Sequence, residues 1–267
     1  MGNASAFLLM VKHWMSDLQA PPYLSPSSIS TFQQCPLKYK LSRIDGLVEP
    51  PTEATLRGNY VHSVLEDLYG LPASERTVDS ARALAKRWWE NEYEEKTAPY
   101  VRGDKDRRMF RWTSWWCIEN LFLMENPQEI HFDGLETELN DDIDGVAIKG
   151  FIDRWRKSSD GIIVGDYKTG KAPAPRFQED KYFQLMLYAV VLEKQLQEQV
   201  EEVEILFIKD SVRLARKVEN SDREKVKSTV VSVRKQIDER CASGVFEPIK
   251  HRLCDWCSFK QICPLWS

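Results

Sequence analysis

Hydrophobic positions in the first half of the chain repeat at helical spacing. The segment "TLRGNYVHSVLEDLYG" (55–70) predicts a helix, and similar patterns predict helices at about 79–96 and 106–126. Earlier, "SPSSISTFQQCP" (25–36) offers hydroxyl caps for a short helix that leads to Cys35. We expect four tryptophans of the longer helices to pack in the core rather than to stack on bases: Trp88, Trp89, Trp115 and Trp116.

The pattern then changes to short apolar runs separated by turn sequences. "FDGLETELN", "GVAIKGFIDRWR" and "GIIVGDYK" alternate with "DDID" and "KSSDG", which predicts a three-stranded meander. Residues 178–197 return to helical spacing, 203–210 are typical of a fourth strand, and 221–244 of a final helix. This order predicts an α/β fold in which helices cover a sheet.

The third of these runs ends in a carboxylate and an amine. Strand alternation places Asp166 and Lys168 on one side, with Tyr167 on the other. If the two strands pair through "KSSDG", Asp153 of the preceding strand can approach Asp166. Two carboxylates beside one amine leave a net negative charge, which Mg²⁺ or Mn²⁺ would neutralise. The alternative is a buried Asp–Lys pair that only holds the sheet together.

Four of the six cysteines have spacing that indicates metal ligation. Cys254, Cys257 and Cys263 form a dense cluster, and Cys35 lies far earlier in the chain. In a cytosolic protein, such spacing indicates a metal site rather than disulfides. Three late thiolates leave a tetrahedral site one ligand short, so we expect Cys35 to be the fourth. Zinc and a [4Fe–4S] cluster both accept four thiolates, and the spacing leaves that choice open.

Length and charge narrow the possible functions. The 267 residues suffice for one large core, or for a core with a smaller lobe. A net charge of -4 excludes a general polyanion binder, so contact with nucleic acid requires a local basic groove. Two segments could supply it, although each could equally be a solvated face. Their candidate DNA-binding residues are Arg107, Arg108 and Arg111 in the first and Lys171 in the second.

No apolar segment approaches the length needed to span a bilayer. We therefore expect a cytoplasmic protein with no membrane contact, in which residues 1–22 form a flexible N-terminal extension.

Taken together, these elements resemble the RecB-type branch of the PD-(D/E)XK nuclease superfamily. The matching residues are Gly58 and His62 in G-x-x-x-H, Asp153 in "GFIDRW", Asp166-Tyr167-Lys168 in "GDYKTGK", and Gln184 with Tyr188 in "QLMLY". The resemblance implies a restriction-endonuclease-like core, with a central mixed sheet flanked by helices, a helical N-terminal insertion and a Cys-rich C-terminal iron–sulfur lobe. The implied nuclease domain spans 23–267 and comprises a helical region (55–130), a catalytic core (131–210) and a lobe formed by 245–267 with Cys35.

The resemblance also implies residue roles. The divalent metal would be bound by the side chains of His62, Asp153 and Asp166 and by the Tyr167 carbonyl. Lys168 would position or polarise the attacking water. Gln184 and Tyr188 would line the DNA groove, unless they form a buried polar pair at a helix–sheet contact. Glu136 or Glu138 could support the metal ligands from outside, or both could be solvated.

For the cysteines, the resemblance favours [4Fe–4S] over zinc. "STFQQCPLKYKL" and "CDWCSFKQICP" are similar to the pattern of AddB-type nuclease domains and CRISPR-associated Cas exonucleases. Such relatives imply a metal-dependent DNA exonuclease acting on single strands from an end, in recombination, repair or CRISPR adaptation. The alternatives are a DNA-binding or complex-assembly module with minor nuclease activity, and a zinc-stapled endonuclease. No G-x-x-x-x-G-K-[ST] loop is present, so unwinding would require a helicase partner.

Overall fold

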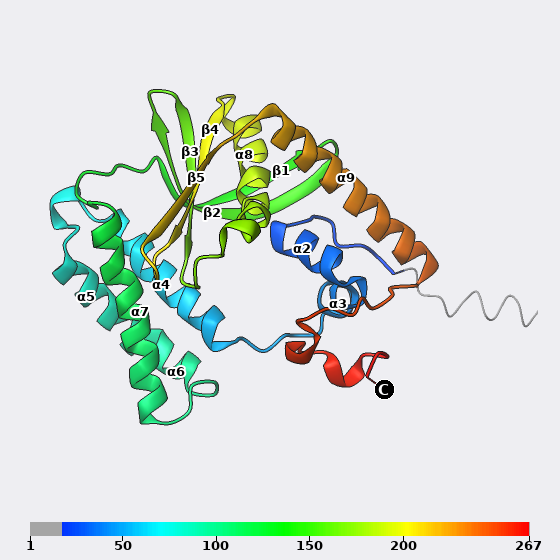
Figure 1. Cartoon of the computed structure of the whole chain (residues 1–267), viewed down its shortest axis with the longest axis horizontal. Helices are drawn as coiled ribbons and strands as arrows, with labels where there is room; N and C mark the ends of the chain where they lie inside the picture. The colour runs from blue at the N-terminus through cyan, green and yellow to red at the C-terminus, as the bar shows by residue number, and fades with distance from the viewer. Residues whose placement is uncertain (1–17, 267) are drawn as a thin grey trace, which may run out of the picture. The chain divides into compact units, whose positions relative to one another are not determined.

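The structure is a computed structural model that describes residues 18–266. Within them, a five-stranded sheet has the order β1-β2-β3-β4-β5 and is flanked by helices, which confirms the expected α/β fold (Figure 1). The strands are β1 (Gly134–Ile143), β2 (Val146–Ser158), β3 (Gly161–Lys168), β4 (Val200–Phe207) and β5 (Val212–Lys217). The helices are α2 (Pro26–Gln34), α3 (Pro36–Tyr39), α4 (Glu53–Gly70), α5 (Val78–Trp88), α6 (Glu94–Thr97), α7 (Asp104–Met124), α8 (Phe183–Leu196) and α9 (Asn220–Ser243).

The sheet is mixed. Asp144 and Gly145 join β1 to β2 with φ values of 49° and 80°, a two-residue turn whose twist suits a hairpin. β2 pairs antiparallel with β3, β3 parallel with β4, and β4 antiparallel with β5. A parallel pair needs a crossover connection, and α8 provides it between β3 and β4.

Some element boundaries differ from the sequence prediction. β5 was not predicted, because its sequence "VRLARK" is half basic; charged residues are common on edge strands, where they discourage pairing with other chains. The helix expected at 79–96 is broken after Trp88 by a π-helical turn over Trp89–Tyr93. The helix expected at 178–197 begins at Phe183, after short 3-10 turns.

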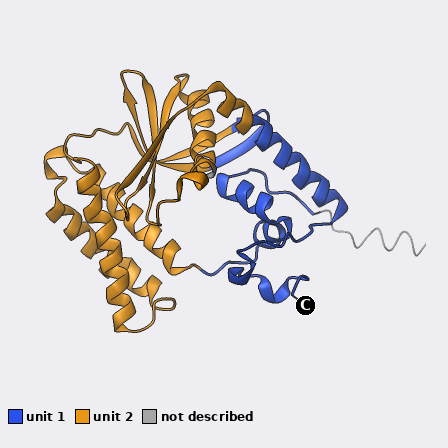
Figure 2. Cartoon of the chain, in the orientation of Figure 1, with its two compact units in different colours: residues 1–50, 142–149, 227–267 blue, residues 51–141, 150–226 orange. Residues whose placement is uncertain are grey.

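The described chain divides into two compact units, each built from separate stretches of sequence (Figure 2). In its described part, unit 1 comprises residues 18–50, 142–149 and 227–266. Unit 2 comprises residues 51–141 and 150–226. Within the described residues, no helix is both long and apolar enough to cross a membrane. Residues 1–17 of the extension expected at 1–22 lie outside the described part of the chain.

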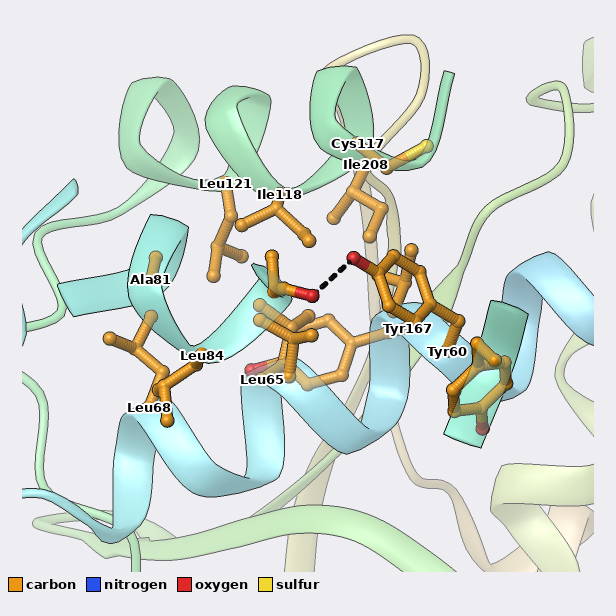
Figure 3. Packing of buried hydrophobic residues seen from close by; sticks show 14 of the residues in the cluster. Tyr60, Leu65, Leu68, Ala81, Leu84, Cys117, Ile118, Leu121, Tyr167 and Ile208 are labelled. Carbon is orange, nitrogen blue, oxygen red and sulfur yellow. Dashed lines mark hydrogen bonds between the residues drawn. The ribbon is translucent and has the colours of Figure 1, made fainter. Parts of the chain in front are cut away.

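In unit 2, helices α4, α5 and α7 bury their apolar faces against each other and against the ends of β3 and β4 (Figure 3). The buried cluster includes Leu65, Leu68, Ala81, Leu84, Cys117, Ile118, Leu121, Tyr167 and Ile208. The Tyr60 hydroxyl donates a hydrogen bond to the Ala85 carbonyl at 2.7 Å, so this buried polar group is satisfied. Because strand residues alternate, Tyr167 faces the cluster while Asp166 and Lys168 face the opposite side, where α8 packs.

Unit 1 has its own smaller core. A capping box starts α2, in which the Ser25 side chain accepts from the Ser28 backbone while the Ser28 side chain accepts from the Ser25 backbone. The Phe32 and Tyr39 rings meet edge to face with centroids 5.4 Å apart. Residues of α9 spaced three or four apart are buried in the same unit: Val230, Val233, Ile237 and Cys241.

Candidate active site

Asp153 lies beside the strand that carries Asp166, as the sequence predicted from strand pairing. Its Oδ2 atom accepts a hydrogen bond from the Tyr167 backbone N–H at 2.7 Å. This bond fixes the carboxylate against β3, and only a tenth of the Asp153 side chain is exposed. β2 and β3 therefore bring both acids of the predicted motif to one edge of unit 2.

His62 joins this edge from α4. Neighbouring residues Val61, Val64 and Leu65 are buried, which anchors the helix and directs the imidazole toward the strands. His62 Nε2 lies 2.9 Å from the Tyr167 carbonyl oxygen, and Nδ1 lies 3.5 Å from Asp153 Oδ2. Ligands that neighbour each other around Mg²⁺ are also about 2.9 Å apart, given metal–oxygen bonds of about 2.0–2.1 Å. The Nε2 and carbonyl positions therefore fit both a hydrogen bond and a shared cation.

Glu136 of β1 completes the group. Its Oε1 lies 3.8 Å from His62 Nδ1, and ligand atoms of His62, Glu136 and Asp153 all lie within 4.8 Å of one another. Sequence reasoning gave Glu136 only a supporting or solvated role. Its φ of 41° is uncommon for a residue with a side chain and costs on the order of 1–3 kcal/mol. Strand alternation could not have found the direction of this side chain, because that rule assumes regular extended backbone.

Asp166 is the most deeply buried acid of the site, with 4% of its side chain exposed. Lys168 Nζ donates to Oδ1 at 2.8 Å, and the Gln184 amide lies 3.3 Å from the same oxygen. Lys168 Nζ also lies 2.8 Å from Oδ2, but without the geometry of a hydrogen bond, so Oδ2 is buried with no hydrogen-bond donor. The Lys168 ammonium is therefore the charge partner of the whole carboxylate, although only Oδ1 accepts a hydrogen bond from it.

The pKa values at the site show an excess of negative charge. Burial raises the pKa of Asp153, and the nearby Asp166 carboxylate raises it further. Burial alone would lower the pKa of His62, but Asp153, Glu136 and Asp166 outweigh this effect and raise it. The site therefore attracts positive charge, whether from protons or from a metal ion.

Gln184 and Tyr188 lie one turn apart on α8, and the Gln184 amide donates to the Tyr188 hydroxyl at 3.5 Å. Gln184 is half-buried and reaches Asp166. Tyr188 is 6% exposed and packs on Gly150, where a Cβ atom would lie 2.5 Å from the ring. The contact between Gln184 and Tyr188 and the burial of the Tyr188 ring are the geometry expected of a polar pair at a helix–sheet contact, the alternative to a role in the DNA groove.

The four basic residues considered for DNA binding differ in their exposure to solvent and in their position. Arg108 and Arg111 are exposed and line one pocket together with Trp112. Arg107 is half-buried, and its Nε has no hydrogen-bond partner. Lys171 is exposed in the loop after β3.

The four tryptophans expected in the core also divide. Trp89 is buried, while Trp88 and Trp115 are partly buried against the core cluster. Trp116 contradicts the expectation: it is 43% exposed and stacks on Trp112 at the surface of α7.

The four cysteines selected from the sequence line a single cavity of about 210 Å³ in unit 1. Cys35 lies between α2 and α3, while Cys254, Cys257 and Cys263 lie at the ends of two short 3-10 turns. The His251 backbone N–H donates to Cys254 Sγ at 3.3 Å.

Comparisons with known proteins extend over nearly the whole chain. A profile of the PD-(D/E)XK nuclease superfamily matches residues 23–264. The Gene 69 proteins of Mycobacterium phages D29 and L5 are 25% and 23% identical over 274 and 292 residues, covering 92% of this chain and 98% and 97% of theirs. A crystal structure described as "Putative exonuclease" from Eubacterium rectale has a TM-score of 0.57 at 15% identity and covers 96% of this chain and 92% of its own. This last likeness indicates a common fold.

Proposed function

Since this chain belongs to the PD-(D/E)XK nuclease superfamily, we propose that it is a divalent-metal-dependent deoxyribonuclease that degrades single-stranded DNA from an end. The observation that carries the proposal is the group of acidic and imidazole ligands at the D-x-K edge of β3. Ligand atoms of His62, Glu136 and Asp153 lie within 4.8 Å of one another, next to Asp166. A purely structural Asp–Lys pair would not need this surplus of ligands.

Mg²⁺ or Mn²⁺ fits these residues. Asp153, Asp166 and Glu136 supply hard carboxylate oxygens, and the Tyr167 carbonyl adds another. His62 contributes a nitrogen that Mn²⁺ accepts readily. The surplus of carboxylates over the single Lys168 ammonium is the strongest local indication of a further cation.

When bound, the divalent cation would lower the pKa of water and screen the phosphate charge. The protein's own groups orient the reaction around it. Lys168 is held against Asp166 but is partly exposed, so its ammonium can also donate to a phosphate oxygen as charge develops there. Gln184 restrains Asp166 from the α8 side, and the Tyr167 N–H restrains Asp153.

The exonuclease mode and the biological role go beyond family membership. They are supported by the resemblance to RecB-type nucleases and by the description of the Eubacterium rectale protein as a "Putative exonuclease". The phage origin of the two Gene 69 relatives favours recombination or repair of DNA over CRISPR adaptation. A partner helicase would supply unwinding.

We also propose that residues 245–267 with Cys35 form an iron–sulfur lobe that holds a [4Fe–4S] cluster. Lys38 and Lys260 line the same cavity as the thiols, and each forms an ion pair at 2.8 Å, with Glu49 and Asp255 respectively. Zinc would hold thiolates at about 2.3 Å, and therefore about 3.8 Å from each other. In residues 18–266, His62, Glu136 and Asp153 are the only potential metal ligands found in a group of three or more within 4.8 Å. The choice of [4Fe–4S] over zinc rests on the resemblance to RecB-type nucleases.

Removal of the Lys168 amine tests the proposed mechanism. Linear single-stranded DNA incubated with Mn²⁺ should be shortened by the wild-type protein, and Lys168→Ala should slow this roughly 100- to 1,000-fold, the cost of losing one donor to developing charge. Lys157→Ala is the matched control. Lys157 lies on β2 of the same sheet and forms an exposed ion pair with Glu198, so this variant should retain full activity. Gel analysis of end-labelled strands measures the rates.

Two outcomes would contradict the proposal in different ways. Equal degradation by wild type and Lys168→Ala would remove the mechanism. Cleavage of circular single-stranded DNA would remove the exonuclease mode, and strands blocked at one end or the other would show the polarity of digestion.

A further inference from the structure

Unit 2 contains a second site, which none of the candidate metal ligands lines. Helices α5 and α7 border a pocket of about 420 Å³ with cationic and aromatic walls. Its principal lining residues are Arg82, Lys86, Arg108, Arg111, Trp112 and Trp115. We call this set of residues the strand cradle.

Helical periodicity explains how the strand cradle forms. Positions 108, 111, 112 and 115 are spaced three, four and seven apart, so they share one face of α7. Phe110, Ser114 and Cys117 lie on the buried face and fix the helix against the core. On α5, Arg82 and Lys86 are likewise four apart and exposed, while Ala81, Leu84 and Ala85 are buried or nearly so.

The strand cradle carries more positive charge than its neighbours neutralise. Arg82 pairs with Asp79 at 3.2 Å, and Lys86 lies 3.8 Å from Glu90. In the described part of the chain, Arg108 and Arg111 have no carboxylate within 4 Å, and Arg111 instead lies over the Trp89 ring at 5.1 Å. Two unpaired guanidinium groups beside each other are notable in a chain of net charge -4.

The aromatic wall continues outside the pocket. Trp112 is 58% exposed and stacks on Trp116, with centroids 5.7 Å apart and planes at 24°. Trp115 is partly buried beneath Arg82, whose guanidinium lies 5.0 Å from its ring centre. Two stacked indoles on a helix surface form a contiguous exposed apolar patch, a feature that marks binding sites. Such rings stack on nucleic acid bases regardless of sequence.

We propose that the strand cradle binds a nucleotide of single-stranded DNA, with its phosphate between Arg108 and Arg111 and its base against Trp112. The inference rests on the proposed nuclease function and names an anchor point for the substrate apart from the metal ligands. The two unpaired guanidinium groups suit a phosphate, and the stacked rings suit an unpaired base. An acidic protein segment would satisfy the charges but would leave the indole stack without a planar partner.

Binding to metal-free protein tests the inference without catalysis. A fluorescent oligo-dT of about 12 nucleotides is titrated with the full-length chain in EDTA at several salt concentrations. Trp112→Ala should weaken binding about 5- to 100-fold, the range expected for loss of one stacked base, while Trp112→Tyr should restore most of it. Arg108→Ala should weaken binding and also reduce the slope of log affinity against log salt by about 0.7, because one phosphate contact is lost.

Each test variant has a control variant in which a similar side chain is removed outside the strand cradle. Lys217→Ala removes one exposed positive charge on β5, and Leu123→Ala removes an exposed apolar side chain on α7; both should bind like wild type. Thermal unfolding of every variant verifies that the fold is intact. Wild-type affinity and salt slope in Trp112→Ala and Arg108→Ala would overturn the inference, and so would an affinity loss shared by both controls.

The result is separable from the proposed function. If wild-type protein binds oligo-dT through Arg108 and Trp112 but does not cut DNA with Mn²⁺, the nuclease mechanism fails and the strand cradle stands. If the wild-type protein cuts DNA but neither substitution changes oligo-dT binding, the inferred DNA contact at the strand cradle is contradicted and the nuclease mechanism is retained.

Discussion

At the scale of single residues, the negative charge of the candidate active site raises the pKa values of Asp153 and His62. The pKa of Asp153 is raised to about 7, because burial and the neighbouring Asp166 disfavour its anion. The pKa of His62 is raised to about 9, because burial is outweighed by Asp153, Glu136 and Asp166. Both groups bind protons more tightly in the folded chain than in the unfolded chain, whose pKa values are about 3.9 and 6.5. Their contribution to stability is therefore present at low pH and lost as pH rises through about 7 and 9.

We expect Mn²⁺ affinity to rise as pH increases from about 6 to 9, because a cation at this site must displace the protons of Asp153 and His62. Isothermal titration at several pH values, with buffers of different ionisation enthalpy, measures both affinity and proton release. His62→Gln should flatten the upper part of the profile. Constant affinity over the whole range would show that these groups do not share the cation.

The approach of three candidate site residues to one another could be predicted from the sequence for a clear physical reason. Asp153, Asp166 and Lys168 lie on regular paired strands, where alternation and register determine which side chains meet. The approach of His62 from a distant helix came only from the family resemblance, since no local pattern relates α4 to β3. The position of Glu136 could not be predicted, because its positive φ departs from the strand geometry on which such reasoning depends.

At the scale of elements, a buried ion network stabilises the side of the sheet opposite to the acids. Arg154 is 2% exposed and donates to Glu125 and Glu204, each at 2.6 Å, and to the Tyr167 hydroxyl at 2.8 Å. Gly165 leaves the space for it, since a Cβ there would lie 2.7 Å from Arg154 Nε. Because the Tyr167 backbone contacts both His62 and Asp153, this network also supports the candidate active site.

We expect Arg154→Met to reduce the free energy of unfolding by about 3–5 kcal/mol, because it leaves Glu125 and Glu204 buried without their shared partner. Urea denaturation measures the change. Arg156→Met, two residues along the same strand and on the same side, is the matched control and should cost less than about 1 kcal/mol. A similar loss in both variants would mean that the network contributes no specific stability.

Most elements were predictable from periodicity, and the exceptions share a cause. The meander, the crossover helix and the long helices have strong apolar repeats. β5 has only a weak repeat, because an edge strand contacts the sheet along one side and carries charges. The break after Trp88 reflects packing of Trp89 and Tyr93 into the core cluster, which favours a local π turn that propensity does not encode.

At the scale of the whole molecule, the cysteine cavity lies in unit 1 and the candidate active site in unit 2. We expect protein purified without oxygen to contain about four irons per chain and to lose them in Cys257→Ser, with a lower thermal midpoint. Cys241→Ser is the control, because Cys241 is buried in α9 and does not line the cavity. Iron and zinc analysis measures the content. A colourless protein with one zinc per chain would favour the zinc alternative.

The interleaving of the two units in the sequence has a consequence for biosynthesis. Every residue of unit 2, including His62, Asp153, Asp166 and Lys168, has left the ribosome once residue 226 and the length of the exit tunnel have been translated. Cys35 emerges much earlier but must wait for Cys254, Cys257 and Cys263 before its cavity can close. A ribosome stalled at this point would therefore expose all the proposed cutting residues, while Cys35 would be the one thiol of the four outside the tunnel.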